Sequence, residues 1–124
     1  MGKKILAIDD DIDILSIFQL VLEEDGFEVI TSQIGISPEA LSLMLPDLIL
    51  LDINIDGFPK SGVDICTEYK MHKAVEHVPV LLVSSEHNLE MLAASCKANG
   101  FLSKPFNITE LTNKVKEFVS SEIN

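Results

Sequence analysis

Arginine is absent from this sequence of 124 residues, and nine lysines stand against twenty acidic residues, which gives a formal net charge of -11. A surface with that balance repels phosphate backbones and anionic lipids. We therefore expect that this domain does not bind nucleic acid directly and does not associate with a membrane surface.

Cysteine is also scarce. The two cysteines, Cys66 and Cys96, fall in helix-like segments and form neither a CxxC motif nor a Cys/His cluster. A thiolate metal site or a disulfide framework therefore has little support. We expect both residues to be buried, reduced thiols.

Long hydrophobic runs are missing as well. No apolar stretch approaches the ~20 residues of a membrane span, and the opening MGKKILAIDD has too few apolar residues for a secretory signal. There is no internal repeat, linker or low-complexity tract. These absences lead us to expect a cytoplasmic protein.

The composition is that of a folded domain, because 47% of the residues are hydrophobic and 23% are charged. A chain of this length typically forms one core and not two. We therefore expect residues 1–124 to be a single domain.

Short runs rich in Ile, Leu and Val alternate with longer amphipathic stretches, five of each. The apolar runs predict strands over residues 4–8, 27–31, 48–51, 80–83 and 101–102. The amphipathic stretches predict helices over residues 12–25, 38–45, 62–73, 89–99 and 108–121. Because several strands are apolar at consecutive positions, the predicted sheet is parallel and covered on both faces.

Five successive βα units joined by right-handed crossovers indicate an α/β fold with a doubly wound, five-stranded parallel sheet. The strand order 2-1-3-4-5 of flavodoxin-like folds suits this (βα)5 pattern. In such sheets ligands bind beyond the carboxyl ends of the strands. The functional site is therefore expected at that edge.

Helix boundary signals are clear in the sequence. Gly26 and Gly100 are predicted to end helices, and Ser37 with Pro38 is predicted to begin one. Asn107 with Glu110 has the spacing of a capping box. The last helix carries one apolar stripe, which is expected to be core. Its members are Ile108, Leu111, Val115 and Phe118.

Acidic residues follow two predicted strands that neighbour each other in this order. Asp9 and Asp10 follow the first strand and Asp52 follows the third, so the three should share one crevice. Carboxylates ~5 Å apart repel by about 3 kcal/mol at an effective dielectric near 20. Asp11 lies before a helix and is either its N-cap or a further ligand.

Carboxylates without nearby His or Cys suit a hard cation, and we expect Mg²⁺. Asp52, alone at the end of the central strand, is the candidate nucleophile for a phosphoryl group. Lys104 can neutralise a phosphoryl oxygen, and the Ser84 hydroxyl can donate to another. The site therefore contains the groups needed for phosphoryl transfer.

The segments KKILAIDDD, DLILLD, VPVLLVSS and GFLSKPF resemble the receiver domain of bacterial two-component response regulators, in particular single-domain regulators like those of chemotaxis. The resemblance covers essentially the whole chain. It implies that Asp52 is the phosphoacceptor and that Asp10 binds the metal directly. Asp9 would act largely through water, and Asn54 would offer its backbone carbonyl.

The resemblance also assigns residues that respond to phosphorylation. Ser84 matches the hydroxyl residue that reorients toward the phosphoryl group, and Lys104 matches the phosphate-binding lysine. Phe101 matches the aromatic switch position, although a Phe on a buried strand is equally well explained as core. Lys104–Pro105 is a candidate cis peptide bond, and Asn54 and Glu86 match positions that tune dephosphorylation.

The implied function is a stand-alone receiver that is not an enzyme in the usual sense and catalyses only its own phosphorylation and dephosphorylation. Its implied partners are a sensor histidine kinase or a histidine phosphotransfer protein, and an unknown downstream protein. The chain could also be part of a longer regulator or hybrid kinase. Two alternatives are a degenerate receiver that is never phosphorylated and a phosphatase of the haloacid dehalogenase type.

Three features depart from the family pattern. Asp56 stands where the family usually has proline, and the stretch of residues 52–62 is about two residues longer than usual. The segment between Ser84 and Lys104 is about two residues shorter. An acid on the longer loop could either add to metal affinity or repel a phosphodonor. His87 is expected to be an exposed loop residue.

Overall fold

The five predicted βα units are present in the computed structural model, which describes residues 3–119. The strands are β1 (Lys4–Ile8), β2 (Glu28–Ser32), β3 (Leu48–Leu51), β4 (Val80–Ser84) and β5 (Gly100–Ser103). The helices are α1 (Ile12–Glu24), α2 (Pro38–Met44), α3 (Gly62–Lys70), α4 (Leu89–Ser95) and α5 (Ile108–Val119). All strand pairs are parallel. The order β2-β1-β3-β4-β5 confirms the flavodoxin-like prediction.

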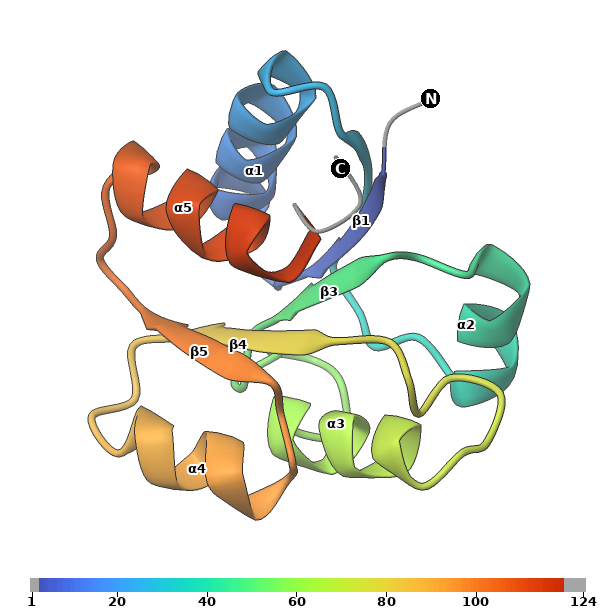
Figure 1. Ribbon diagram of the computed structural model, residues 1–124. Helices are drawn as coiled ribbons and strands as arrows, with labels where there is room; N and C mark the ends of the chain where they lie inside the picture. Colours follow the sequence, from blue (N-terminus) through green and yellow to red (C-terminus); the bar gives the residue numbers. More distant parts are fainter. Residues whose placement is uncertain (1–2, 120–124) are drawn as a thin grey trace.

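The sheet separates two helical layers. Helices α1 and α5 cover one face, and α2, α3 and α4 cover the other (Figure 1). Alternate residues of each central strand serve opposite faces, so Leu50 joins the core under α1 and α5 while Leu51 joins the core under the other three helices. Two-sided burial explains why the central strands are apolar at consecutive positions.

Helix starts follow the predicted capping residues. The Ser37 hydroxyl accepts the Ala40 N–H at the start of α2, and Asn107 and Glu110 exchange reciprocal hydrogen bonds at the start of α5. Gly26, with φ +95°, follows α1 as expected.

Helix ends differ more from the prediction. Helix α4 ends at Ser95, and the chain then turns at Lys97, whose φ is +62°. Gly100 therefore does not end a helix; it begins β5, where an added Cβ would lie 2.9 Å from the Phe118 ring. Helix α3 ends at Lys70, three residues before its predicted end. The predicted last residues of α5, 120 and 121, lie outside the described residues.

The apolar stripe of α5 needs one correction. Leu111 and Val115 are fully buried and Phe118 packs against them, but Ile108 is 59% exposed. It occupies the first helical position and lines a surface groove instead of the core.

Both cysteines are free and buried, as predicted. The Cys66 thiol donates to the Cys96 carbonyl oxygen at 3.4 Å. Within the described part of the chain, every helix falls short of the length and apolarity needed to cross a bilayer.

Candidate functional site

Three carboxylates converge beyond the carboxyl ends of β1 and β3. These strands pair with Ile8 opposite Leu51, so the residues that follow them leave the sheet side by side. Carboxylate oxygens of Asp9, Asp10 and Asp52 all lie within 4.8 Å of one another. The sequence predicted this convergence from strand order alone.

Backbone hydrogen bonds extend the sheet into the site. The Asp9 N–H donates to Ser32 O at 3.1 Å, and the Asp52 N–H donates to Ile8 O at 2.9 Å. Asp9 and Asp52 are almost completely buried, whereas Asp10 is half-buried. Two of the three charges therefore lie in a poorly hydrated environment, where repulsion between them is costly.

Lys104 is the cation that partly balances these acids. Its Nζ lies 2.8 Å from Asp9 Oδ2 and 3.4 Å from Asp52 Oδ2. Burial opposes the charged amine, but the hydrogen bond to Asp9 and the two carboxylate charges raise the pKa of Lys104. The Lys104 N–H also donates to Ser84 O, which fixes the start of the β5–α5 loop beside the site. The peptide bond between Lys104 and Pro105 is cis, as predicted.

Asp52 is strained electrostatically in the absence of a further cation. Burial first, and then the negative charge of Asp9, raise the pKa of Asp52 to about 6, although Lys104 and the Ile53 N–H oppose the shift. One ammonium against three carboxylates leaves an excess of negative charge. Oxygen-only donors in this number fit a hard divalent cation such as Mg²⁺.

Ser84 is the last residue of β4, the strand next to β3, and Phe101 lies on β5, one strand further from the cluster. Ser84 is fully buried, and its Oγ accepts the Glu86 N–H at 3.3 Å. Phe101 is partly buried against the core under α3 and α4. Its packing fits a core residue, and its switch role stays a prediction.

The β3–α3 and β4–α4 loops meet across the opening of the site. The Asn54 side-chain amide donates to Glu86 Oε2 at 2.7 Å. Its side chain is thus directed to Glu86, and the predicted use of its backbone carbonyl as a metal ligand stays a prediction. His87 is exposed, as expected for a loop histidine.

The two uncertain acids have structural explanations. Asp11 is the N-cap of α1, because its Oδ1 accepts the Asp13 N–H at 2.9 Å and it is outside the converging group. The Asp56 side chain is exposed and is also outside that group. Asp56 instead reaches the site through its backbone N–H, which donates to Asp10 Oδ2 at 3.2 Å.

Sequence reasoning assigned Gly62 only as the predicted start of a helix and gave it no part in the site. A Cβ at this position would overlap the carbonyl oxygen of Asp52. The Gly62 N–H also donates to Ile53 O at 2.8 Å. A glycine at the first position of a helix, where alanine would favour the helix, was the signal that something packs closely against it.

The comparisons with known proteins agree with this geometry. A model of the response regulator receiver domain matches residues 5–116. The chain belongs to the receiver domain family of response regulators. Receiver domains of this family are parts of signalling proteins.

Individual relatives of this receiver domain cover nearly all of it. The alkaline phosphatase synthesis transcriptional regulatory protein PhoP of Bacillus subtilis is 33% identical over 120 residues, 94% of this chain but 48% of PhoP. The chain thus spans about half the length of the curated relatives it matches. A stand-alone arrangement therefore stays a prediction.

Solved structures share the fold. Chemotaxis protein CheY4 of Vibrio cholerae has a TM-score of 0.79 at 23% identity, covering 95% of this chain and 99% of CheY4. The receiver domain of sensor histidine kinase PA1611 from Pseudomonas aeruginosa has a TM-score of 0.84 at 20% identity, covering 97% and 99%. That domain is described with a magnesium ion coordinated in its active-site cleft.

Proposed function

We propose that this receiver domain takes a phosphoryl group on Asp52 from a phosphohistidine of a sensor histidine kinase or a histidine phosphotransfer protein. One observation carries the proposal: a buried Asp52 carboxylate shares a crevice with Asp9 and Asp10 while Lys104 contacts both Asp9 and Asp52. A carboxylate in that setting gains a favourable environment when a phosphoryl group and a cation enter together.

The transfer step is a substitution at phosphorus. An Asp52 carboxylate oxygen forms the new O–P bond as the P–N bond to the donor imidazole breaks, and the imidazole leaves with the bonding electron pair. Lys104 then offers its ammonium to a phosphoryl oxygen, and the Ser84 hydroxyl donates to another. Such transfer depends mainly on positioning and charge neutralisation, which these side chains provide.

We expect Mg²⁺ to be held by the carboxylates of Asp9, Asp10 and Asp52 and by the Asn54 backbone carbonyl, with Asp9 acting largely through water. When bound, the ion neutralises phosphoryl and carboxylate oxygens. The shared fold of the PA1611 receiver, described with magnesium in its cleft, supports this choice of ion.

An apolar groove beside the site is suited to the donor protein. It has a volume of about 860 Å³ and runs between α1 and the start of α5, reaching Lys104 at one end. Its apolar lining includes Ile14, Ile17, Leu20, Phe106 and Ile108. Because this groove borders the phosphoacceptor, a donor helix that packs there would bring its phosphohistidine close to Asp52.

Phosphorylation is proposed to change what the domain binds. The added charge draws Ser84 and Lys104 toward the phosphoryl group, and Phe101, on the strand that leads to Lys104, would carry the change to the surface near α4 and α5. An unknown downstream protein would read that surface. Hydrolysis of the acyl phosphate resets the domain, at a rate tuned by Asn54 and Glu86.

The proposal is tested by incubating the protein with Mg²⁺ and acetyl phosphate and measuring intact mass. We expect the mass of one added phosphoryl group per chain, removed by hydroxylamine. The adduct should be missing in Asp52→Asn and after chelation of the metal. A wild-type chain that stays unmodified would support the degenerate receiver instead, and sustained turnover of a phosphomonoester would support a phosphatase.

A further inference from the structure

The loop between β3 and α3 contacts the acidic cluster through its backbone. The Asp56 N–H donates to Asp10 Oδ2 at 3.2 Å, joining residues 46 positions apart in the sequence. The Asp56 side chain points to solvent. The contact therefore requires an amide hydrogen at position 56, which a proline cannot supply.

A turn fixes the direction of this amide. The Phe58 N–H donates to Ile55 O at 3.1 Å, and Gly57 between them has φ +81°. These features define a type II turn with Asp56 at its second position and Gly57 at its third. Proline is favoured at the second position of such a turn, so the N–H of Asp56 can be deleted without disturbing the turn.

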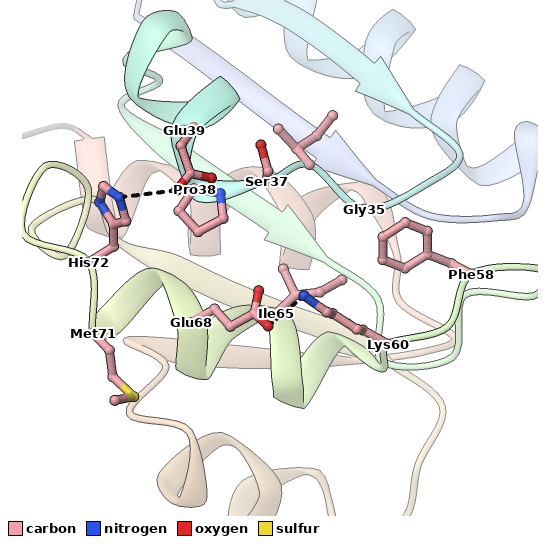
Figure 2. Close-up of a pocket in the computed structure, with 11 residues that line it drawn as sticks. Gly35, Ser37, Pro38, Glu39, Phe58, Lys60, Ile65, Glu68, Met71 and His72 are labelled. Atoms are coloured by element: carbon pink, nitrogen blue, oxygen red, sulfur yellow. Dashed lines mark ion pairs between the residues drawn. The ribbon is translucent and has the colours of Figure 1, made fainter.

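The ends of the turn are anchored in the core. Ile55 is 5% exposed, and Phe58 packs against the core under α2 and α3. The Phe58 ring lies next to Gly35, at the edge of a cavity of about 670 Å³ on the α2 and α3 side of the molecule (Figure 2). Apolar packing on both sides of Asp56 therefore holds its amide in place before any ligand binds.

Asp10 is held from a second direction. The Gln33 side-chain amide donates to the Asp10 carbonyl oxygen at 3.2 Å. The Asp56 amide and the Gln33 amide together fix both the backbone and one carboxylate oxygen of Asp10. Among the described residues, no hydrogen bond is donated to the other carboxylate oxygen, Oδ1, which leaves it free of competition for a cation.

We propose that the Asp56 backbone amide is a positioning group for Mg²⁺ binding, which orients Asp10 as a ligand and links the ion to the β3–α3 loop. This inference rests on the proposed metal site. Ligating carboxylates are commonly oriented by hydrogen bonds of this kind, and losing such a partner weakens metal affinity about 10- to 100-fold. The exposed position of this bond favours the lower end of that range.

The test compares two variants at one position. Asp56→Ala removes the side-chain charge and keeps the N–H, whereas Asp56→Pro removes both. Calorimetric titration of the full chain with Mg²⁺ alone should give a dissociation constant about tenfold higher for Asp56→Pro than for Asp56→Ala. The two variants should have the same melting temperature in chelator. If the amide only stabilised the fold, Asp56→Pro would melt at a lower temperature than Asp56→Ala. Equal Mg²⁺ affinities would overturn the proposal.

A second measurement covers the case in which Asp56→Pro folds poorly. Hydrogen exchange of the Asp56 amide should be slow in the metal-free wild type and faster in Asp10→Ala, and equal exchange rates would overturn the proposal.

The Asp10→Ala variant also distinguishes a failure of the proposed metal site from a failure of the role assigned to the Asp56 amide. If Asp10→Ala binds Mg²⁺ as the wild type does, the proposed metal site itself is wrong. If Asp10→Ala loses Mg²⁺ binding while Asp56→Pro keeps the affinity of Asp56→Ala, only the role of the amide is wrong.

Discussion

The surroundings of Asp52 are those expected of a carboxylate prepared for the phosphoryl transfer proposed above. Burial and the nearby Asp9 charge disfavour its ionised form, and Lys104 offsets only part of that cost. This balance is unfavourable, and the proposed cation would make it favourable. The site is therefore organised for a ligand at the expense of local stability.

The first prediction follows from this imbalance. The pKa of Asp52 rises from 3.8 in the reference state to about 6 in the folded protein, so the folded state holds the proton more tightly than the unfolded chain. The proton on Asp52 therefore stabilises the fold fully below pH 3.8, and this stabilisation is lost as the pH rises through about 6. In chelator, we expect wild type to lose about 3 kcal/mol relative to Asp52→Asn across this range.

Urea denaturation at a series of pH values measures this difference directly. Asp52→Asn keeps the shape of the side chain and has no proton to lose, so it serves as the matched control. Parallel stability curves for the two proteins would show that Asp52 is not strained in the folded state.

A second prediction concerns Gly62. Alanine at this position would force the Asp52 backbone to move, because its Cβ would overlap the Asp52 carbonyl oxygen. We expect Gly62→Ala to lower the free energy of unfolding by about 1–3 kcal/mol and to slow phosphorylation by acetyl phosphate.

Gly26→Ala is the control for this prediction. Gly26 has a φ of +95°, a backbone conformation that disfavours alanine, but an added Cβ there would have no atom within 4 Å. Its substitution should destabilise the fold while leaving the phosphorylation rate unchanged. A normal rate in Gly62→Ala would contradict the assigned role of that glycine.

The main site residues could be predicted because each one follows a strand, and parallel strands deliver their carboxyl ends to one edge. Asp9, Asp52 and Lys104 were located in this way. The contribution of Asp56 could not be predicted, because it is made by a backbone N–H whose direction depends on a turn. Gly62 was missed for a related reason, since a glycine at the first position of a helix signals close packing but does not say which group packs against it.

At the scale of the elements, helix starts were more predictable than helix ends. Starts carry side-chain caps such as Ser37 and Asn107, which the sequence displays. Two ends instead use non-glycine residues with positive φ, Leu45 after α2 and Lys97 after α4. Such ends depend on tertiary packing and carry none of the usual glycine signal.

The N-cap of α1 gives a third prediction. Asp11 caps the helix and is outside the carboxylate cluster. Asp11→Ala should therefore cost about 1 kcal/mol of stability, while Asp11→Asn should retain most of it because asparagine is a good N-cap.

Calorimetric titration with Mg²⁺ distinguishes the cap from a ligand. Both variants should bind Mg²⁺ with an affinity close to that of the wild type, in contrast to Asp10→Ala. Loss of Mg²⁺ binding in Asp11→Asn would mean that Asp11 is a direct ligand after all.

At the scale of the whole molecule, the sheet separates two surfaces. The apolar groove that reaches Lys104 is lined by residues of α1 and of the start of α5. These two helices cover one face of the sheet (Figure 1). The cavity bordered by Phe58 lies on the face covered by α2 and α3. Donor docking is therefore expected on one side of the molecule only.

Opposing surface substitutions test this separation. Leu20 lies in the groove on α1 and is 72% exposed, and Leu43 lies on α2 and is 87% exposed. Leu20→Asp should slow phosphotransfer from a phosphorylated histidine kinase about tenfold and leave phosphorylation by acetyl phosphate unchanged. Leu43→Asp should affect neither reaction. Equal effects of the two substitutions on kinase transfer would rule out the groove as the docking surface.

The most direct measurement identifies the modified atom. Borohydride reduces an aspartyl phosphate to homoserine, and peptide mapping by mass spectrometry then locates the change. After treatment with Mg²⁺ and acetyl phosphate, we predict homoserine at position 52 and at no other acid, with none formed in chelator. Homoserine at another position, or none at all in the presence of Mg²⁺, would contradict the assignment of Asp52 as the phosphoacceptor.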